Sequence, residues 1–198
     1  MISECLWNTL QELEIGDVEK RSLSKYNPQT RGFRLRILNK NFDISPKNRN
    51  VRQVDPTPAQ TLDFYLQLAA VNYLIGAKEL PLIGTWVSET QFPTGPLFFR
   101  GPHKMPTNLL ETAFGRNKED FTLISLSHGG KNVDEGDCAF EFFFFPRLPV
   151  RLILWLADEE FPARMIFLFD RSANQHLQLD GLWAVGKALA NQLLKNIS

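Results

Sequence analysis

The stretch AFEFFFFPRLPVRLILWLADEEFPARMIFLFD, residues 139–170, contains three apolar runs. The runs AFEFFFFP, VRLILWLAD and ARMIFLFD are separated by the links RLP and EEFP, which have the length of hairpin connections. We therefore predict an antiparallel meander. Alternate residues of a strand point to opposite faces, so Phe142 and Phe144 should lie on one face and Phe143 and Phe145 on the other. We expect helices to cover both faces.

The amino-terminal part predicts one short helix and one hairpin. In ISECLWNTLQELEIG, Ser3 is placed to cap an amphipathic helix that Gly16 ends. In GFRLRILNKNFDIS, residues 32–45, apolar residues alternate with Arg34 and Arg36. This alternation predicts a hairpin with one solvated, basic face.

Three further segments have helical patterns. In residues 57–76, Thr57 is placed as the cap, Pro58 as the first helical residue and Gln60 at the capping-box position. This helix should end near Gly76 and be largely buried. Residues 117–130 fit a helix or a short strand, and we favour the helix. A terminal helix over residues 178–196, with Asp180 as its cap, should pack on the sheet. The chain is thus expected to form a single α+β domain, residues 1–198, with an antiparallel or mixed sheet that includes the carboxyl-terminal meander and is covered by several helices.

Composition and termini exclude several classes of protein. The chain has 198 residues, 43% of them hydrophobic, and a formal net charge of zero. No apolar run reaches the roughly 20 residues needed to cross a bilayer, and the acidic amino terminus does not resemble a secretion signal. We therefore expect a cytoplasmic protein that does not interact with a membrane. The two cysteines, Cys5 and Cys138, are expected to be reduced and buried.

The zero net charge conceals two segments of opposite sign. Residues 20–52 contain ten Lys and Arg residues against the single acid Asp43. In residues 134–160 the acidic residues outnumber the basic ones, which are Arg147 and Arg151. The two segments could complement each other within the fold or across a self-association surface, so an oligomer is compatible with the sequence. Arg34 and Arg36 of the basic hairpin region could also bind a protein partner. An isoelectric point near 6.8 argues against nucleic acid.

The carboxyl-terminal half resembles a known family. The motifs GTWVSETQFPTG, FFRGPH, PRLP, DEEFP and LFDRSA, within residues 62–189, resemble the bacterial and archaeal domain of unknown function DUF3786. Similar chains are fused to cysteine-rich iron–sulfur segments, which implies a redox or tetrapyrrole context. This chain has no cysteine cluster, so we do not expect it to hold an iron–sulfur cluster itself, and the identity of any cofactor stays open.

The loop RGPHKMP, residues 100–106, is the first candidate site. It presents Arg100, His103 and Lys104 between a glycine and two prolines, and such a rigid loop could bind a carboxylate or phosphate. The alternative is a proline-stiffened corner with solvated charges. Asp170 and Arg171, at the end of the last predicted strand, are further ligand-binding candidates.

Two functions from different classes remain open. The preferred one is a non-enzymatic binding or accessory module for an anionic small molecule, cofactor or protein partner, because no nucleophile–base pair or metal-ligand spacing is present. The alternative is an enzyme in which His103 acts as general acid or base with Asp158, Glu159 or Asp170. The acidic cluster DEEFP lacks a histidine at ligand spacing, so we predict no metal site there.

Overall fold

The computed structural model describes residues 2–54 and 62–195. Its helices are α1 (Glu4–Glu12), α2 (Ile15–Ser22), α3 (Phe64–Gly76), α4 (Gly95–Phe98), α5 (Thr107–Phe114), α6 (Lys118–Ser127), α7 (Ala173–His176) and α8 (Leu179–Leu194), with the 3-10 turns η1 (Glu89–Gln91) and η2 (Gly101–His103). Its strands are β1 (Lys25–Asn27), β2 (Gly32–Ile37), β3 (Lys40–Ser45), β4 (Asn50–Gln53), β5 (Trp86–Val87), β6 (Lys131–Val133), β7 (Cys138–Phe145), β8 (Leu148–Trp155) and β9 (Arg164–Asp170). The predicted α+β class is confirmed.

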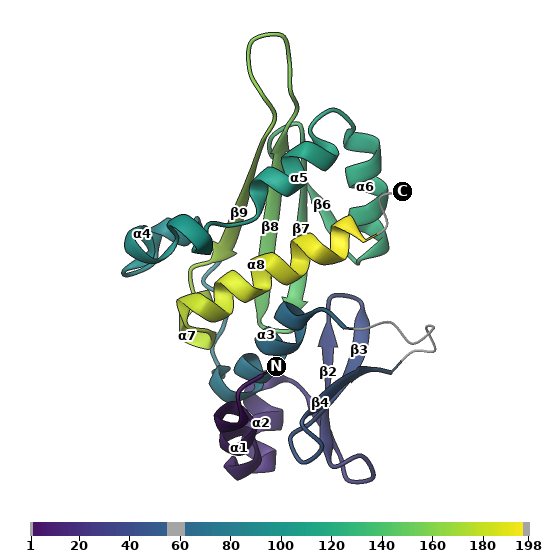
Figure 1. Cartoon of the computed structure of the whole chain (residues 1–198), viewed down its shortest axis with the longest axis vertical. Coiled ribbons are helices and arrows are strands. Elements are labelled where there is room, and N and C mark those ends of the chain that lie inside the picture. The colour runs from purple at the N-terminus through teal and green to yellow at the C-terminus, as the bar shows by residue number, and fades with distance from the viewer. Residues whose placement is uncertain (1, 55–61, 196–198) are drawn as a thin grey trace.

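The predicted meander forms the centre of an antiparallel sheet with the order β5-β9-β8-β7-β6 (Figure 1). The pairing of β7 with β8 shifts register between Phe143 and Phe145. This irregularity interrupts the alternation of side chains, so Phe144 and Phe145 are both fully buried while Phe143 remains 37% exposed. The prediction that Phe143 and Phe145 lie on the same face, opposite Phe144, was wrong for this reason.

In the part of the chain that the structure describes, helices cover one face of this sheet. In Figure 1, α5, α6 and α8 lie on the same side of β7, β8 and β9. On the other side, Arg151 forms ion pairs with Glu135 and Glu141 at 2.5 and 3.0 Å and lies 3.9 Å from the ring centre of Trp86. Paired charges and the Trp86 ring lie on this face in place of a second helical layer, and the expectation that helices cover both faces was wrong.

The basic hairpin belongs to a second antiparallel sheet with the order β1-β2-β3-β4. Its register places Phe33 opposite Ile44 and Leu35 opposite Phe42, and these four side chains are buried. The arginines of β2 point to the opposite face, which confirms the predicted hairpin with one solvated, basic face.

The amino-terminal segment, for which one helix was predicted, contains the end of α1 and the start of a second helix, α2. Helix α1 ends at Glu12, and Leu13 is extended. The Glu14 carboxylate accepts hydrogen bonds from the backbone N–H groups of Gly16 and Asp17, so it caps a second helix. Gly16 therefore lies in the first turn of α2 rather than at the end of α1, and the predicted boundary was wrong.

The other helix ends follow local capping. Asp63 accepts from Leu66 N at 2.9 Å and caps α3, which ends at Gly76 as predicted. The expected cap and first turn at Thr57, Pro58 and Gln60 lie outside the described residues. Asn117 caps α6, which confirms the helix there. Helix α8 begins after Gln178, whose side chain forms no capping hydrogen bond, so Asp180 lies in the first turn and the prediction that it is the cap was wrong.

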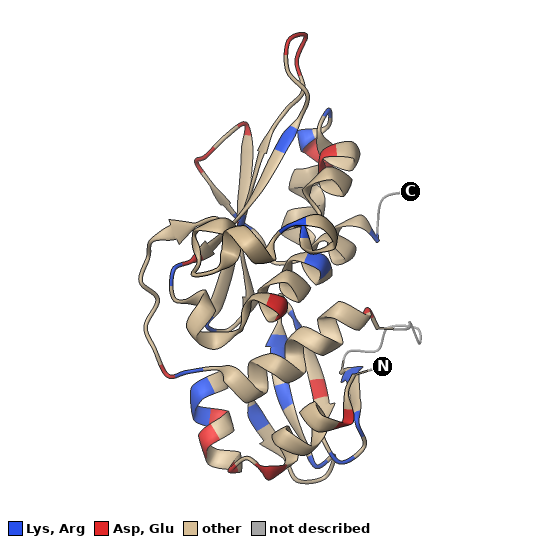
Figure 2. Cartoon of the chain, turned by 60° about the vertical axis from the view of Figure 1, so that its left-hand side comes forward, with Lys and Arg blue, Asp and Glu red and all other residues tan. Residues whose placement is uncertain are grey.

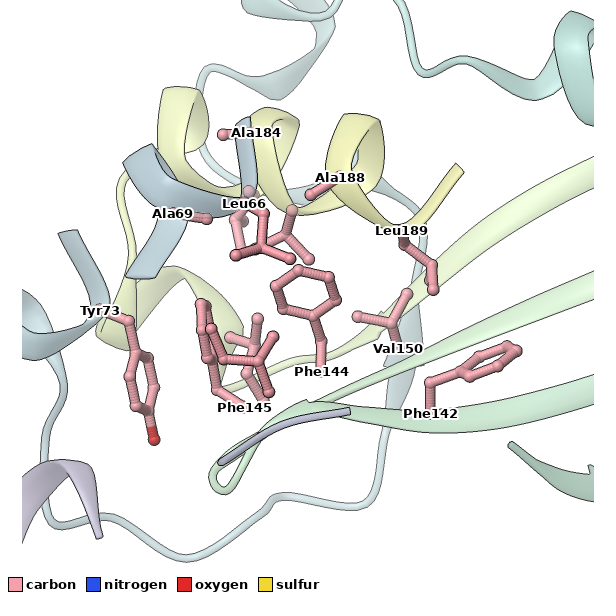
Figure 3. Packing of buried hydrophobic residues seen from close by; sticks show 14 of the residues in the cluster. Leu66, Ala69, Tyr73, Phe142, Phe144, Phe145, Val150, Ala184, Ala188 and Leu189 are labelled. Atoms are coloured by element: carbon pink, nitrogen blue, oxygen red, sulfur yellow. The ribbon is translucent and has the colours of Figure 1, made fainter. Parts of the chain in front are cut away.

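One hydrophobic cluster joins the two sheets and the helices. Figure 3 shows Phe144 pointing from β7 toward α8, with Leu66 of α3 close by, while Tyr73 lies beside Phe145. The Tyr73 and Phe145 rings stack with their centres 4.3 Å apart. Burial of each such ring stabilises the fold by about 1.5–3 kcal/mol, and this packing fixes the β7–β8 turn against α3.

Two further expectations can be compared with the structure. Cys138 is buried and Cys5 is exposed, and both are free thiols, so the prediction that both cysteines are buried was wrong for Cys5. Cys5 lies in the first turn of α1, on the side of the helix away from the buried Trp7 and Leu10. No helix in residues 2–54 or 62–195 is long and apolar enough to span a membrane.

Candidate functional site

The RGPHK loop packs as a corner against the carboxyl-terminal helix. The His103 ring stacks on Phe98 with centres 4.6 Å apart and meets Trp183 of α8 edge-on at 5.2 Å. The backbone carbonyl of Lys104 accepts a hydrogen bond from Trp183 Nε1 at 3.3 Å. Arg100 is exposed. The loop is therefore held by its rings and backbone, and its cationic side chains are left at the surface.

Asp170 organises the chain around the end of β9. Its carboxylate accepts hydrogen bonds from Ile83 N, Gly84 N, Ser172 N and Ser172 Oγ at 3.0, 2.6, 2.9 and 2.6 Å. Burial alone would raise the pKa of Asp170, but these hydrogen bonds hold it below its usual value. The adjacent Arg171 is exposed, and its backbone N–H donates to the Thr85 carbonyl. Asp170 thus joins β9 to the loop that leads into β5.

The carboxylates considered as partners for His103 lie elsewhere. Asp158 and Glu159 belong to the β8–β9 loop, which projects at one end of the molecule, while α4 and the following turn lie at its side (Figure 1). Within the described ranges, no hydrogen bond or ion pair links Arg100, His103 or Lys104 to Asp170 or Arg171. The structure therefore separates Asp158 and Glu159 from the RGPHK loop, and among the described residues it shows no direct polar contact between that loop and Asp170 or Arg171.

The two arginines of the basic hairpin differ in their partners. Arg34 lies opposite Asp43 across the β2–β3 pair and forms two hydrogen bonds with its carboxylate, at 2.9 and 3.1 Å. Arg36 lies opposite the neutral Asn41, so the register offers it no carboxylate. Its Nε donates to the Leu38 carbonyl at 3.2 Å, and its Nη groups form no hydrogen bond with other residues that the structure describes, so they can donate to a ligand.

Arg36 borders a cavity between the two sheets. The cavity has a volume of about 340 Å³. It is lined by Arg36, Leu38, Asn39, Gly129, Lys131, Phe143 and Pro146. Arg36 lies in β2, and Leu38 and Asn39 form the β2–β3 turn. The other lining residues come from the link between α6 and β6, from β6 itself, from β7 and from the β7–β8 turn. Two cations and one exposed aromatic ring therefore share a single hollow.

The wall of this cavity is held by backbone contacts. Leu38 N donates to the Phe144 carbonyl at 3.0 Å, and Asn39 Nδ2 donates to the Ser127 carbonyl at 2.7 Å. Gly129 has φ of 80°, and a Cβ there would lie 2.9 Å from Cβ of Asn39. Only glycine allows this close approach in a left-handed conformation. The cavity is thus built into the fold before any ligand arrives.

Lys131 adds the second positive charge. Its cross-strand neighbour Glu141 pairs with Arg151, and Lys131 forms no ion pair among the described residues. Its Nζ lies 5.9 Å from the ring centre of Phe143. A cation over a ring face and a guanidinium with free Nη donors can bind a carboxylate or phosphate together, while the ring offers apolar surface to the rest of the ligand.

The chain matches a domain of unknown function (DUF3786) over residues 14–192. It belongs to the DUF3786 family. The match is wider than the resemblance found from the motifs and includes α2, the basic hairpin and every residue that lines the cavity. No curated protein matches the chain. No solved structure matches it either.

The motifs that resembled DUF3786 hold this DUF3786 domain together. In PRLP, Arg147 donates from Nε to the Arg21 carbonyl at 3.0 Å and from the Nη groups to the carbonyls of Leu80 and Lys20 at 3.4 Å. In DEEFP, Asp158 accepts from the N–H groups of its own turn, and in LFDRSA, Asp170 accepts the four hydrogen bonds described above. Each of these three motifs therefore has a structural role.

Sequence reasoning did not identify Asn39, Lys131 or Phe143 as site residues. Lys131 follows the pair Gly129–Gly130, which indicated only the end of a helix, and Phe143 was assigned to covered strand surface. A signal was nevertheless present: Arg36 faces an asparagine if the hairpin is folded at Asn39, whereas Arg34 then faces Asp43. A hairpin register derived from the sequence would therefore have predicted an acidic partner for Arg34 and none for Arg36.

Proposed function

We propose that this DUF3786 domain is a binding module that holds an anionic group in the cavity between its two sheets. The observation that supports the proposal is the convergence of Arg36 and Lys131 on one preformed hollow beside Phe143. Neither cation has an ion-pair partner among the described residues. A ligand carboxylate would therefore supply the counter-charge that Asp43 supplies to Arg34.

The lining also indicates the class of ligand. Phe143 is 37% exposed, and Pro146 and Leu38 extend the apolar part of the wall. Burial of apolar ligand surface contributes roughly 25 cal/mol per Å², and a charge-assisted hydrogen bond contributes about 1.5–3 kcal/mol. The expected ligand is thus a carboxylate or phosphate attached to an apolar or aromatic group.

This proposal is favoured over an enzyme based on His103. Among the described residues, the His103 ring packs against two aromatic side chains, Phe98 and Trp183. A general acid or base needs a proton acceptor or donor of the substrate within hydrogen-bond reach and a group that orients its ring. The described contacts of His103 are packing contacts between rings, which supports a structural role for this residue rather than a catalytic one.

Nuclear magnetic resonance titration tests the proposal with a matched pair of probes. Phenylacetate should shift the backbone amide signals of Asn39, Gly129 and Lys131 saturably, whereas the neutral isostere phenylacetamide should bind at least tenfold more weakly. Arg36→Gln and Lys131→Gln should each weaken phenylacetate binding by about tenfold, which corresponds to 1.4 kcal/mol. The exposed Arg116→Gln and Lys118→Gln serve as matched controls. Equal binding of both probes, or binding unaffected by either cavity variant, would refute the proposal.

A further inference from the structure

The β8–β9 loop presents an acidic and aromatic tip, defined here as residues 158–161. Asp158 Oδ1 accepts hydrogen bonds from Glu160 N and Phe161 N at 2.8 and 2.7 Å, and Asp158 N donates to the Phe161 carbonyl at 3.0 Å. These bonds fix the turn. The Phe161 side chain is 66% exposed. The tip therefore presents an exposed aromatic ring on a fixed turn, directly after the acidic residues Glu159 and Glu160.

The tip cannot reach the cavity of its own chain. The base of the loop is attached to the end of α5, where Ala157 N donates to the Gly115 carbonyl at 2.8 Å. In Figure 1 the loop projects at the far end of the long axis, beyond α5 and α6, and the β2–β3 hairpin lies in the opposite half. Figure 2 shows the red acidic segments at this tip and blue basic segments in the lower sheet. Any contact between them must join two molecules.

We propose that the tip of one copy binds in the cavity of a second copy. This inference rests on the proposed function, because it names a carboxylate-and-ring ligand for the same cavity. Glu159 and Glu160 complement Arg36 and Lys131 in charge, and the Phe161 ring complements the apolar wall formed by Phe143.

The contact has a direct consequence for ligand binding. The tip and the cavity are different surfaces, so one contact leaves a free tip and a free cavity, and a reciprocal pair of molecules satisfies both. A small anionic ligand and a second copy would then compete for one cavity. Self-association would rise with protein concentration and fall when the ligand is present.

Sedimentation velocity with two complementary variants tests the inference. The tip variant Glu160→Lys/Phe161→Ala leaves Asp158 intact, so its turn keeps its shape. The cavity variant is Arg36→Gln/Lys131→Glu. Each should weaken self-association at least tenfold. An equimolar mixture of the two should associate again, because it contains one intact tip and one intact cavity. The matched control Glu12→Lys/Leu97→Ala reverses one exposed acid and truncates one exposed leucine at other places, and it should associate as the parent chain does.

The outcomes separate this inference from the proposed function. Association of the mixture and its loss on addition of phenylacetate would support the inference. A chain that remains monomeric at millimolar concentration, or that associates equally well in both variants, would overturn it. Phenylacetate titration of the tip variant, which has an intact cavity, reports the proposed function independently. Binding there together with a monomeric parent chain refutes only the docking of the tip.

Discussion

Arg147, in the turn between β7 and β8, donates its Nε–H to the backbone carbonyl of Arg21 in the last turn of α2, at 3.0 Å. The last carbonyls of a helix have no partners within the helix. The Nη groups of the same guanidinium reach Lys20 and Leu80, so one side chain ties the meander to the amino-terminal helices and to the segment that leads toward β5.

Replacement of Arg147 by lysine should destabilise the domain. Lysine keeps the charge, but its single ammonium group cannot reach all three carbonyl groups to which the planar guanidinium group donates. We expect Arg147→Lys to lower the free energy of unfolding by about 1–3 kcal/mol, measured by urea denaturation at pH 7. Arg171→Lys, at an exposed position, is the control and should be neutral. Equal stability of both variants would mean that the three hydrogen bonds contribute nothing.

Replacement of Asp170 by asparagine should destabilise the domain in a pH-dependent way. An amide has one acceptor oxygen for the four donors that the carboxylate satisfies, so Asp170→Asn should cost about 1.5–3 kcal/mol at pH 7. The pKa of Asp170 is lowered in the folded state, so its contribution is complete above the unfolded value of about 3.8 and is lost as the pH falls through the folded value. The difference between the parent and the variant in urea denaturation should therefore shrink below pH 4. Ser172→Ala removes one donor and should cost less; a larger loss than in Asp170→Asn would contradict this account.

His176 should make the stability of the domain sensitive to mildly acidic pH. Its Nδ1 accepts a hydrogen bond from Lys78 N at 3.1 Å, and its Nε2 is buried without a partner among the described residues. Burial and the nearby Arg147 lower the pKa of His176 below 6.5. The unfolded chain thus takes up a proton near pH 6.5 before the folded chain does, and the free energy of unfolding falls as the pH decreases below that value.

The variant His176→Asn checks this mechanism, because its amide oxygen can accept from Lys78 N but does not titrate. The urea midpoint of the parent should be lower at pH 5.5 than at pH 7.5, and the variant should show a smaller difference. His128 is a second histidine whose pKa is lowered by burial, so the variant His128→Asn/His176→Asn should show the smallest difference. A pH dependence that is the same in all three proteins would exclude the histidines as its source.

Gly129 should matter for both stability and the cavity. Gly84→Ala is a matched control, since φ at Gly84 is +75° and nothing lies within 4 Å of an added Cβ. That variant should cost only the left-handed strain of about 1–2 kcal/mol. Gly129→Ala should cost more, because its Cβ would also displace Asn39. It should weaken phenylacetate binding as well, whereas Gly84→Ala should not; the reverse order in either measurement would contradict the described wall.

The local elements could be derived from the sequence because their causes are local. Alternating apolar residues determine β2, β3 and the meander strands, since the side chains of a strand point alternately to its two faces. Helix α3 ends at Gly76 as predicted, and a helix was favoured over residues 117–130, where Asn117 caps α6. The boundary at Gly16 was missed because Glu14 caps α2, and a glutamate at that position gives a weaker signal than serine or aspartate.

The cavity and the roles of the motif residues could not be derived in the same way. Arg36 and Lys131 are distant in sequence, and tertiary contacts, among them the hydrogen bonds from Leu38 to Phe144 and from Asn39 to Ser127, bring them to one cavity. The register shift at Phe143 is likewise a property of two paired strands. Composition and periodicity by themselves determined the α+β class, the meander and the basic hairpin, because these depend on neighbours along the chain. Tertiary structure decided which charges form ion pairs and which line the cavity. These outcomes depend on contacts between segments that are distant in sequence, and local sequence patterns do not predict such contacts.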